Sequence, residues 1–225
     1  MAALHIRLLG EFRFVYDDKQ IVAIRQMRQQ TLLAYLLLHR HTPHLRQQIA
    51  FLFWPDNSEA QAHTNLRQLL HHIRRVWPDL DDFVQIDDRV LHWKADVSFT
   101  LDVMEFETRL EQAANAVRSQ QFNVVHVALQ EAVALYGGEL LPGNYEEWLL
   151  SERERLRQRL LDALEQLALF LESRRDYEQA IHYADQLLRA DPLQEITYQH
   201  LMRLHALNGD RSGALRTYHV CASLL

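Results

Sequence analysis

Two short segments near the C-terminal end of the chain repeat each other at a spacing of 34 residues, and this spacing restricts the fold more than any other feature. The first begins at Asp176 and the second at Asp210, and each carries an alanine four residues later, Ala180 and Ala214. A small residue at a repeated position lets two packed helices approach closely. Pro192 follows at the point where such a repeat places a proline before its next helix. The spacing therefore predicts pairs of helices that stack on their neighbours.

Helical periodicity covers the chain beyond residue 101, and no strand pattern occurs there. A period of 34 residues is that of tetratricopeptide repeats. Leu167 and Tyr218 occupy a leucine and an aromatic position of that repeat, whereas Ala184 stands where the first copy would carry an aromatic residue. We therefore expect two degenerate repeats with an irregular helical lead-in. The expected helices span residues 103–116, 123–136, 146–171, 177–190, 193–207 and 212–225.

The first 95 residues combine the two-residue period of β-strands with the 3.6-residue period of helices. Apolar residues alternate from Leu4 to Tyr16, and after a polar turn at Asp17 the alternation resumes over residues 21–24, which indicates a short antiparallel sheet. Three helices are expected at residues 27–40, 46–53 and 58–77, followed by a hairpin of residues 83–86 and 90–93. This order is typical of a winged helix, although a generic α+β domain also shows it.

The fold class that we expect is mostly α with a small antiparallel β part. A winged helix-turn-helix domain would occupy residues 1–96 and an all-α, tetratricopeptide-like helical domain residues 97–225. The net charge of −6 divides at the same place. Residues 1–96 carry twelve Lys and Arg against eleven Asp and Glu, a net of +1, and residues 97–225 carry twelve against nineteen, a net of −7. Repulsion from DNA is therefore not a property of the whole chain.

Composition predicts a soluble, cytoplasmic protein without a catalytic site. Cys221 is the single cysteine, so no internal disulfide can form. No apolar run reaches the roughly 18 residues of a membrane helix, and His5 and Arg7 interrupt the stretch where a signal peptide would be apolar. The thirteen histidines lack the spacing of a metal site. With no glycine-rich phosphate loop and no nucleophile motif, we expect no enzyme activity, cofactor or metal.

Several segments, in this order along the chain, resemble SARP-type (antibiotic regulatory) transcriptional activators. The segments are residues 29–39, Phe53-Trp54-Pro55-Asp56, residues 65–75, residues 102–106 and residues 148–156. The resemblance implies an OmpR-like winged helix followed by a bacterial transcriptional activation domain of tetratricopeptide-like helices. This chain departs from the family at Leu45-Arg46-Gln47-Gln48, where a serine cap and acidic residues are usual. The family's domain also extends further, which implies a C-terminal truncation at Leu225.

The expected third helix has the polar and apolar faces of a DNA-reading helix. Its apolar residues fall within an arc of roughly 120° centred near Ile73. The opposite arc is free of carboxylates, because Glu59 lies only in the first turn, beside the positive end of the helix dipole. Glutamine pairs with adenine and arginine with guanine in the major groove. We therefore predict that the base-reading residues are Gln61, Thr64, Gln68, His71 and Arg75.

Phosphate contacts are predicted for arginines at the helix starts and on the flanks of the third helix, where helix N-termini also favour anions. These residues are Arg25, Arg28, Arg46, Arg67 and Arg74. Arg89, at the turn of the hairpin, is a candidate for a minor-groove contact by the wing, against which its neighbours Asp87 and Asp88 argue.

Two functions remain from this reasoning. The first is a sequence-specific DNA-binding transcriptional regulator, an activator, that binds double-stranded DNA while its helical domain recruits RNA polymerase or self-associates on DNA. The resemblance implies direct-repeat operators. The alternative is a protein-interaction adaptor, whose helical repeats bind a partner and whose winged helix is a docking module. Only the first function requires a third-helix face without acids.

Overall fold

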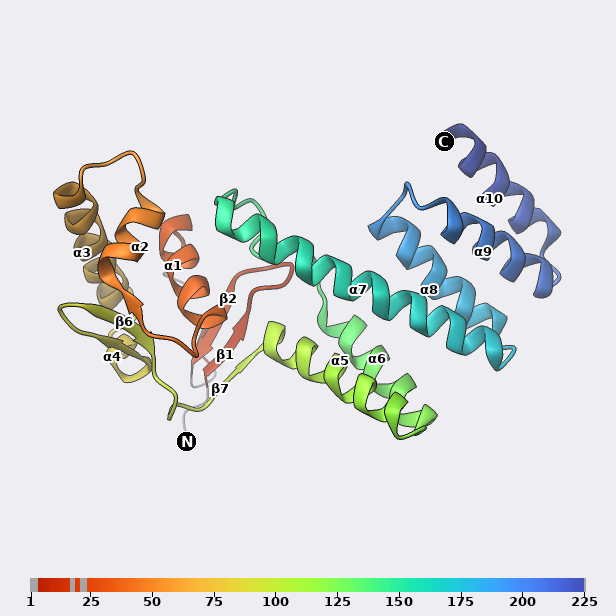
Figure 1. The fold of residues 1–225 in the computed structure, drawn as a ribbon, viewed down its shortest axis with the longest axis horizontal. Coiled ribbons are helices and arrows are strands. Elements are labelled where there is room, and N and C mark those ends of the chain that lie inside the picture. The colour runs from red at the N-terminus through yellow and green to blue at the C-terminus, as the bar shows by residue number, and fades with distance from the viewer. Residues whose placement is uncertain (1–3, 17–18, 21–23, 225) are drawn as a thin grey trace. The chain divides into compact units, whose positions relative to one another are not determined.

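A computed structural model describes residues 4–16, 19–20 and 24–224, and its residue contacts divide the chain into two compact units (Figure 1). The first unit comprises Met1–Leu101 together with Leu141–Asn144, and the second comprises Asp102–Leu140 and Tyr145–Leu225. The expected fold class, mostly α with a small β part, is confirmed. The division differs from the expected boundary after residue 96 in two places, because the first unit extends to Leu101 and also includes a later segment.

The first unit contains three principal helices and two small sheets. One sheet has the strand order β3-β2-β1-β7, in which β1 pairs antiparallel with β2 and parallel with β7. The other has the order β4-β6-β5 and is antiparallel throughout. The elements are β1 (Leu4–Arg7), β2 (Arg13–Tyr16), β3 (Lys19–Gln20), α1 (Met27–Leu38), β4 (His44–Leu45), α2 (Arg46–Phe53), α3 (Glu59–Val76), α4 (Leu80–Phe83), β5 (Val84–Ile86), β6 (Val90–Trp93) and β7 (Phe99–Leu101).

Most of these elements follow the sequence pattern, and four do not. In β1, Leu4 and Ile6 are buried while His5 and Arg7 are exposed, as the alternation predicts. The short elements β3, β4, α4 and β7 were not expected, because two to four residues are too few to show a period. The strand β7 moves the end of the first unit beyond residue 96, since it pairs with β1. The strand expected at residues 21–24 falls mostly outside the described residues.

The helix α3 is fixed at both ends by contacts that its sequence explains. Its first turn is capped by Ser58, whose hydroxyl accepts a hydrogen bond from the backbone N–H of Gln61 at 3.4 Å. At its C-terminal end Trp77 is buried and lies against Phe14 and Phe83, with ring centroids 5.9 and 5.2 Å away. The buried face of α3 includes Leu66, Leu69, Leu70 and Ile73, as predicted. The opposite face is consequently turned to solvent.

Within the described residues, the regular elements of the second unit are all helices. Its helices are α5 (Asp102–Arg118), α6 (Phe122–Leu135), α7 (Glu147–Ser173), α8 (Tyr177–Ala190), α9 (Glu195–Leu207) and α10 (Arg211–Leu224), close to the expected bounds. Successive helices from α5 to α10 pack against one another, and α5 to α9 share a core mainly of alanines and leucines (Figure 1). None of the helices in the described part of the chain is long and apolar enough to cross a membrane.

The two segments spaced by 34 residues occupy equivalent places at the starts of α8 and α10. Asp176 caps α8 and Asp210 caps α10, each accepting a hydrogen bond from the backbone N–H three residues later, at 3.3 and 2.8 Å. The bond from Gly213 lowers the pKa of the Asp210 carboxyl. A Cβ at Gly213 would lie 2.2 Å from a carboxylate oxygen of Asp210, so a side chain there would displace the carboxylate. Ala180 is fully buried, whereas Tyr218, at the predicted aromatic position, is exposed.

Candidate nucleic-acid interface

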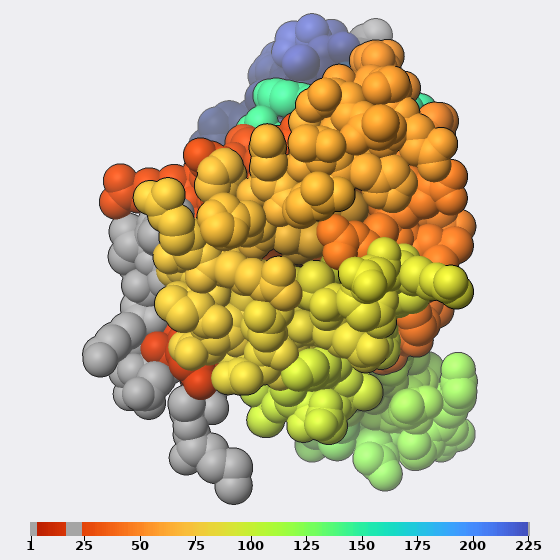
Figure 2. All heavy atoms as spheres, turned by 90° about the vertical axis from the view of Figure 1, so that its left-hand side faces the viewer, coloured from red at the N-terminus to blue at the C-terminus, as the bar shows by residue number. Residues whose placement is uncertain are grey.

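The outward face of α3 and the hairpin of β5 and β6 lie on one side of the first unit. Figure 2 views this side, with α3 as a gold band across the face and the yellow hairpin projecting beside it. Both elements pack on one aromatic cluster. Trp77 at the end of α3 contacts Phe83, and the ring centroids of Phe83 and Trp93 of β6 are 6.2 Å apart. A helix and a hairpin held on a common core can present a surface of fixed shape.

Three of the predicted base-reading residues are available for a partner. Gln68, His71 and Arg75 are exposed, and none of them forms a hydrogen bond or an ion pair with another described residue. They follow one another at spacings of three and four residues, so they lie along one stripe of α3. An amide, an imidazole and a guanidinium in this arrangement offer both donors and acceptors to base edges.

The other two predicted base-reading residues are engaged within α3. The Gln61 side-chain amide donates to Asn65 Oδ1 at 2.8 Å, one helical turn further on. The hydroxyl of Thr64, a half-buried residue, donates to the backbone carbonyl of Ala60 at 2.9 Å. The Gln61 side chain is exposed and can exchange its partner, but the Thr64 hydroxyl retains only acceptor capacity while its bond lasts.

The arginines predicted to contact phosphate fall into two groups. Arg67 is exposed and has no hydrogen bond or ion pair among the described residues, and Arg25 is exposed just before α1. Arg74, by contrast, holds Asp81 through two nitrogens, with Nε 3.0 Å from Oδ2 and Nη2 2.8 Å from Oδ1. A phosphate would therefore have to compete with this carboxylate for Arg74.

Arg28 and Arg46 make contacts inside the first unit that the sequence did not indicate. The guanidinium of Arg28 donates to the backbone carbonyl of Phe53 and lies over the ring of Trp54, 5.4 Å from its centroid. Arg46 donates from its side chain to the backbone carbonyl of Asp87 at 2.9 Å. Its backbone N–H donates to the carbonyl of Arg89 at 2.8 Å, so the first residue of α2 supports the turn of the hairpin.

At the tip of the hairpin, Asp87 is part of the turn itself. One of its carboxylate oxygens accepts hydrogen bonds from the backbone N–H groups of Arg89 and Val90, at 3.0 and 2.7 Å. These bonds, first that from Arg89, lower the pKa of the Asp87 carboxyl. The Arg89 side chain is exposed and makes no hydrogen bond or ion pair within the described chain. One of the two acids beside it is thus turned to the backbone, and Asp88 remains exposed.

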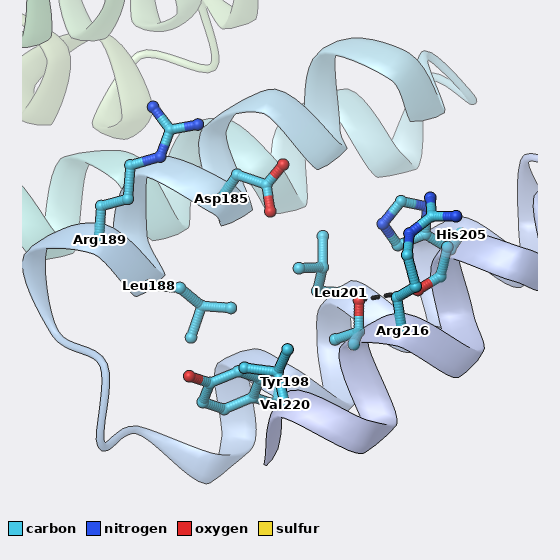
Figure 3. A pocket seen from close by; sticks show the side chains of 10 residues that line it. Asp185, Leu188, Arg189, Tyr198, Leu201, His205, Arg216 and Val220 are labelled. Carbon is cyan, nitrogen blue, oxygen red and sulfur yellow. Dashed lines mark hydrogen bonds between the residues drawn. The ribbon is translucent and has the colours of Figure 1, made fainter. Parts of the chain in front are cut away.

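The second unit contains a cavity of about 390 Å³ between α8, α9 and α10 (Figure 3). Apolar and charged side chains from all three helices line it. The apolar residues include Leu188, Tyr198 and Leu201, and the charged ones Asp185, Arg189 and Arg216. No group of three or more histidine, cysteine or acidic residues in the described chain could hold a metal ion.

Comparisons with known proteins agree with this architecture. The family described as "Bacterial transcriptional activator domain" matches residues 101–225, more than half of the chain. The solved structure titled "Mycobacterium tuberculosis EmbR in complex with low affinity phosphopeptide" matches all of this chain with a TM-score of 0.79 and 17% sequence identity. The present chain spans 60% of the length of that EmbR chain, and at this identity the likeness shows a shared fold. No curated protein sequence is significantly similar.

The family match covers the second unit, and the first unit has the sheet, three helices and hairpin of a winged helix. The resemblance noted from the sequence is thereby confirmed. This chain belongs to the bacterial transcriptional activator domain family, and it joins that domain to a winged helix in the order found in SARP-type regulators.

Proposed function

We propose that this protein is a sequence-specific DNA-binding transcriptional regulator, an activator, that reads the major groove of double-stranded DNA with α3. The observation that carries the proposal is the stripe of Gln68, His71 and Arg75, which are exposed and free of intramolecular hydrogen bonds and ion pairs within the described residues. A solvated helix face ordinarily mixes acids with bases, and this one has no carboxylate beyond its first turn.

The remaining residues have supporting roles in this proposal. Arg67 and Arg25 contact phosphates and so set the register of the protein on the duplex. Arg89 approaches the minor groove from the hairpin. Arg28 and Arg46 mainly stabilise the fold of the first unit, since their guanidinium groups already donate to backbone carbonyls.

Selection of bound sequences from a random duplex library tests the proposal. We expect enrichment of a defined motif, and we expect chromosomal occupancy of the protein to coincide with the same motif. Binding without any enriched motif, at an affinity set only by salt, would show that α3 is a non-specific basic surface. Absence of binding to any duplex would leave the adaptor as the function.

The adaptor function is favoured by one observation, the cavity between α8, α9 and α10. Its mixed apolar and charged lining suits a segment of a partner protein, and stacked helical repeats commonly bind partners in this way. In the regulator that we propose, the same surface is where RNA polymerase would be recruited. The two functions therefore differ in what α3 does, and not in whether the helical unit binds a partner.

The ion pair between Arg74 and Asp81 yields a test of the phosphate-contact assignment. Replacing Asp81 with asparagine should raise affinity for every duplex by up to about fivefold, because an exposed ion pair is worth at most about 1 kcal/mol. The slope of log affinity against log salt concentration should steepen by about one unit, for the one added phosphate contact. Asp79→Asn removes the same charge from an exposed residue without a described partner, and it is the matched control. Equal gains in both variants would mean that net charge alone is responsible, and that Arg74 does not contact DNA.

A further inference from the structure

The segment Leu141–Asn144 follows α6 and precedes α7 in the chain, yet it packs within the first unit. The backbone N–H of Leu141 donates to the carbonyl of Leu8 at 2.9 Å, just beyond the end of β1. Leu141 and Asn144 are each only 2% exposed. Four residues from the connection between two helices of the second unit thus belong to the first, and two of them, Leu141 and Asn144, are buried.

Asn144 connects this segment to α1 through a buried polar contact. Its side-chain amide donates to the hydroxyl of Thr31 at 2.5 Å, and that hydroxyl in turn donates to the backbone carbonyl of Met27 at 2.7 Å. Thr31 is fully buried. A buried hydrogen bond contributes about 0.5–1.5 kcal/mol net, so this contact favours the docked position of the segment.

The backbone of the segment is also in a conformation that needs support. Leu141 has a φ of 48° and Gly143 a φ of 80°, both in the left-handed region that residues with side chains disfavour. A leucine is kept there only where its surroundings determine its conformation, and here these are the buried side chain and the bond to Leu8. On the second unit's side, Arg153 of α7 donates to the carbonyl of Leu140 at 2.8 Å and holds Glu139. Leu140, the residue before the segment, is therefore held by α7, and Leu141 and Asn144 are held by the first unit.

We propose that Leu141–Asn144 is a latch, through which the order of the helical unit sets the stability of the winged helix. While the latch is docked, the chain passes three times between the units, after Leu101, after Leu140 and after Asn144. Local disorder of α6 or α7 releases the segment, and α1 and β1 then lose buried contacts. The effect on stability is independent of what the winged helix binds. Only its consequence for operator affinity rests on the proposed function.

Hydrogen exchange of the full chain tests the latch. Asn144→Ala should accelerate the exchange of α1 and β1 amides about tenfold, for the loss of one buried hydrogen bond, and leave α8–α10 unchanged. Asn123→Ala is the matched control, because Asn123 accepts a hydrogen bond from Arg174 at 2.9 Å within the helical unit. Because that bond is exposed, its loss should change the stability of the helical unit little and leave the exchange of α1 and β1 unchanged.

A second pair of variants tests the coupling itself. Leu164→Ala opens a cavity in the helical core and should accelerate exchange in α1 as well as in α7. With Asn144→Ala already present, Leu164→Ala should accelerate exchange in α1 less, because the weakened latch no longer couples α1 to the helical core. Unchanged exchange in α1 and β1 after Asn144→Ala, and after replacing Leu141–Asn144 with four glycines, would overturn the latch. Since exchange is measured without DNA, this result does not depend on whether the protein binds an operator.

Discussion

Replacing Gln68 and His71 together with alanine should weaken binding to the cognate operator by about 100-fold or more, since each base-reading side chain contributes about 1–3 kcal/mol of discrimination. The two residues are three positions apart on the exposed face of α3, and their replacement leaves the buried face unchanged. The folded protein should therefore keep its thermal stability. On random duplex DNA the loss should be much smaller, because most non-specific affinity comes from phosphate contacts. Titrations of the cognate and the random duplex at a fixed salt concentration measure both effects.

Arg67→Gln is the control for this double variant. Arg67 lies on the same helix and is equally exposed, but it is assigned to phosphate. Its replacement should lower the affinity for both duplexes by a similar factor. It should also reduce the slope of log affinity against log salt concentration by about one unit. If the double variant behaved in the same way as Arg67→Gln, the stripe of α3 would be a phosphate-binding surface and the assignment of base readers would be wrong.

The sequence predicted α3 and the repeats well because their signals are local. The Ser58 cap and the regular placing of Leu66, Leu69, Leu70 and Ile73 are contained within twenty residues, and they reproduce the observed bounds of α3. The starts of α8 and α10 were likewise marked by their own capping aspartates. Elements of this kind can be predicted from nearby residues alone.

The elements that the sequence did not predict depend on distant partners. The strand β7 pairs in parallel with β1, and Leu4 is matched to Phe99 across more than ninety residues. In the sequence, the Leu141–Asn144 segment interrupts the helical periodicity with leucine, proline and glycine in succession, which indicates only a loop. Its contacts with Leu8 and Thr31 have no pattern in the sequence. Such pairings become visible only once the chain is folded.

The assignment of arginines shows a limit of a different kind. Arg28 and Arg46 bind backbone carbonyls, Arg74 binds a carboxylate, and Arg67 has no such contact among the described residues. The guanidinium group has the same five donors in each case, and it binds carbonyl, carboxylate and phosphate oxygens alike. Position on a helix therefore indicates that an arginine is available, but its neighbours in the fold decide which oxygen it binds.

Moving the two half-sites of a direct-repeat operator apart by about five base pairs should abolish cooperative binding, with a loss of about 5–150-fold in affinity for the second copy. Direct repeats imply head-to-tail contacts between two different patches of neighbouring copies. Residues 1–96 carry a net charge of +1 and residues 97–225 a net of −7, so a basic face of one copy would meet the acidic helical unit of the next. Glu165 and Glu178 are exposed there without a described ion-pair partner and are available for this contact.

Such a contact is weak in free solution, because exposed ion pairs contribute little and salt screens them. We therefore expect a monomer without DNA and cooperative pairing on it. Five base pairs rotate one copy to the opposite side of the duplex, whereas ten restore the original side at a greater distance. Footprinting on operators with both insertions separates the two effects, since partial recovery at ten base pairs would show that the rotational phase matters. If binding is equally tight at five base pairs, the copies do not touch, and the acidic helical unit must serve a partner other than a second copy of this chain.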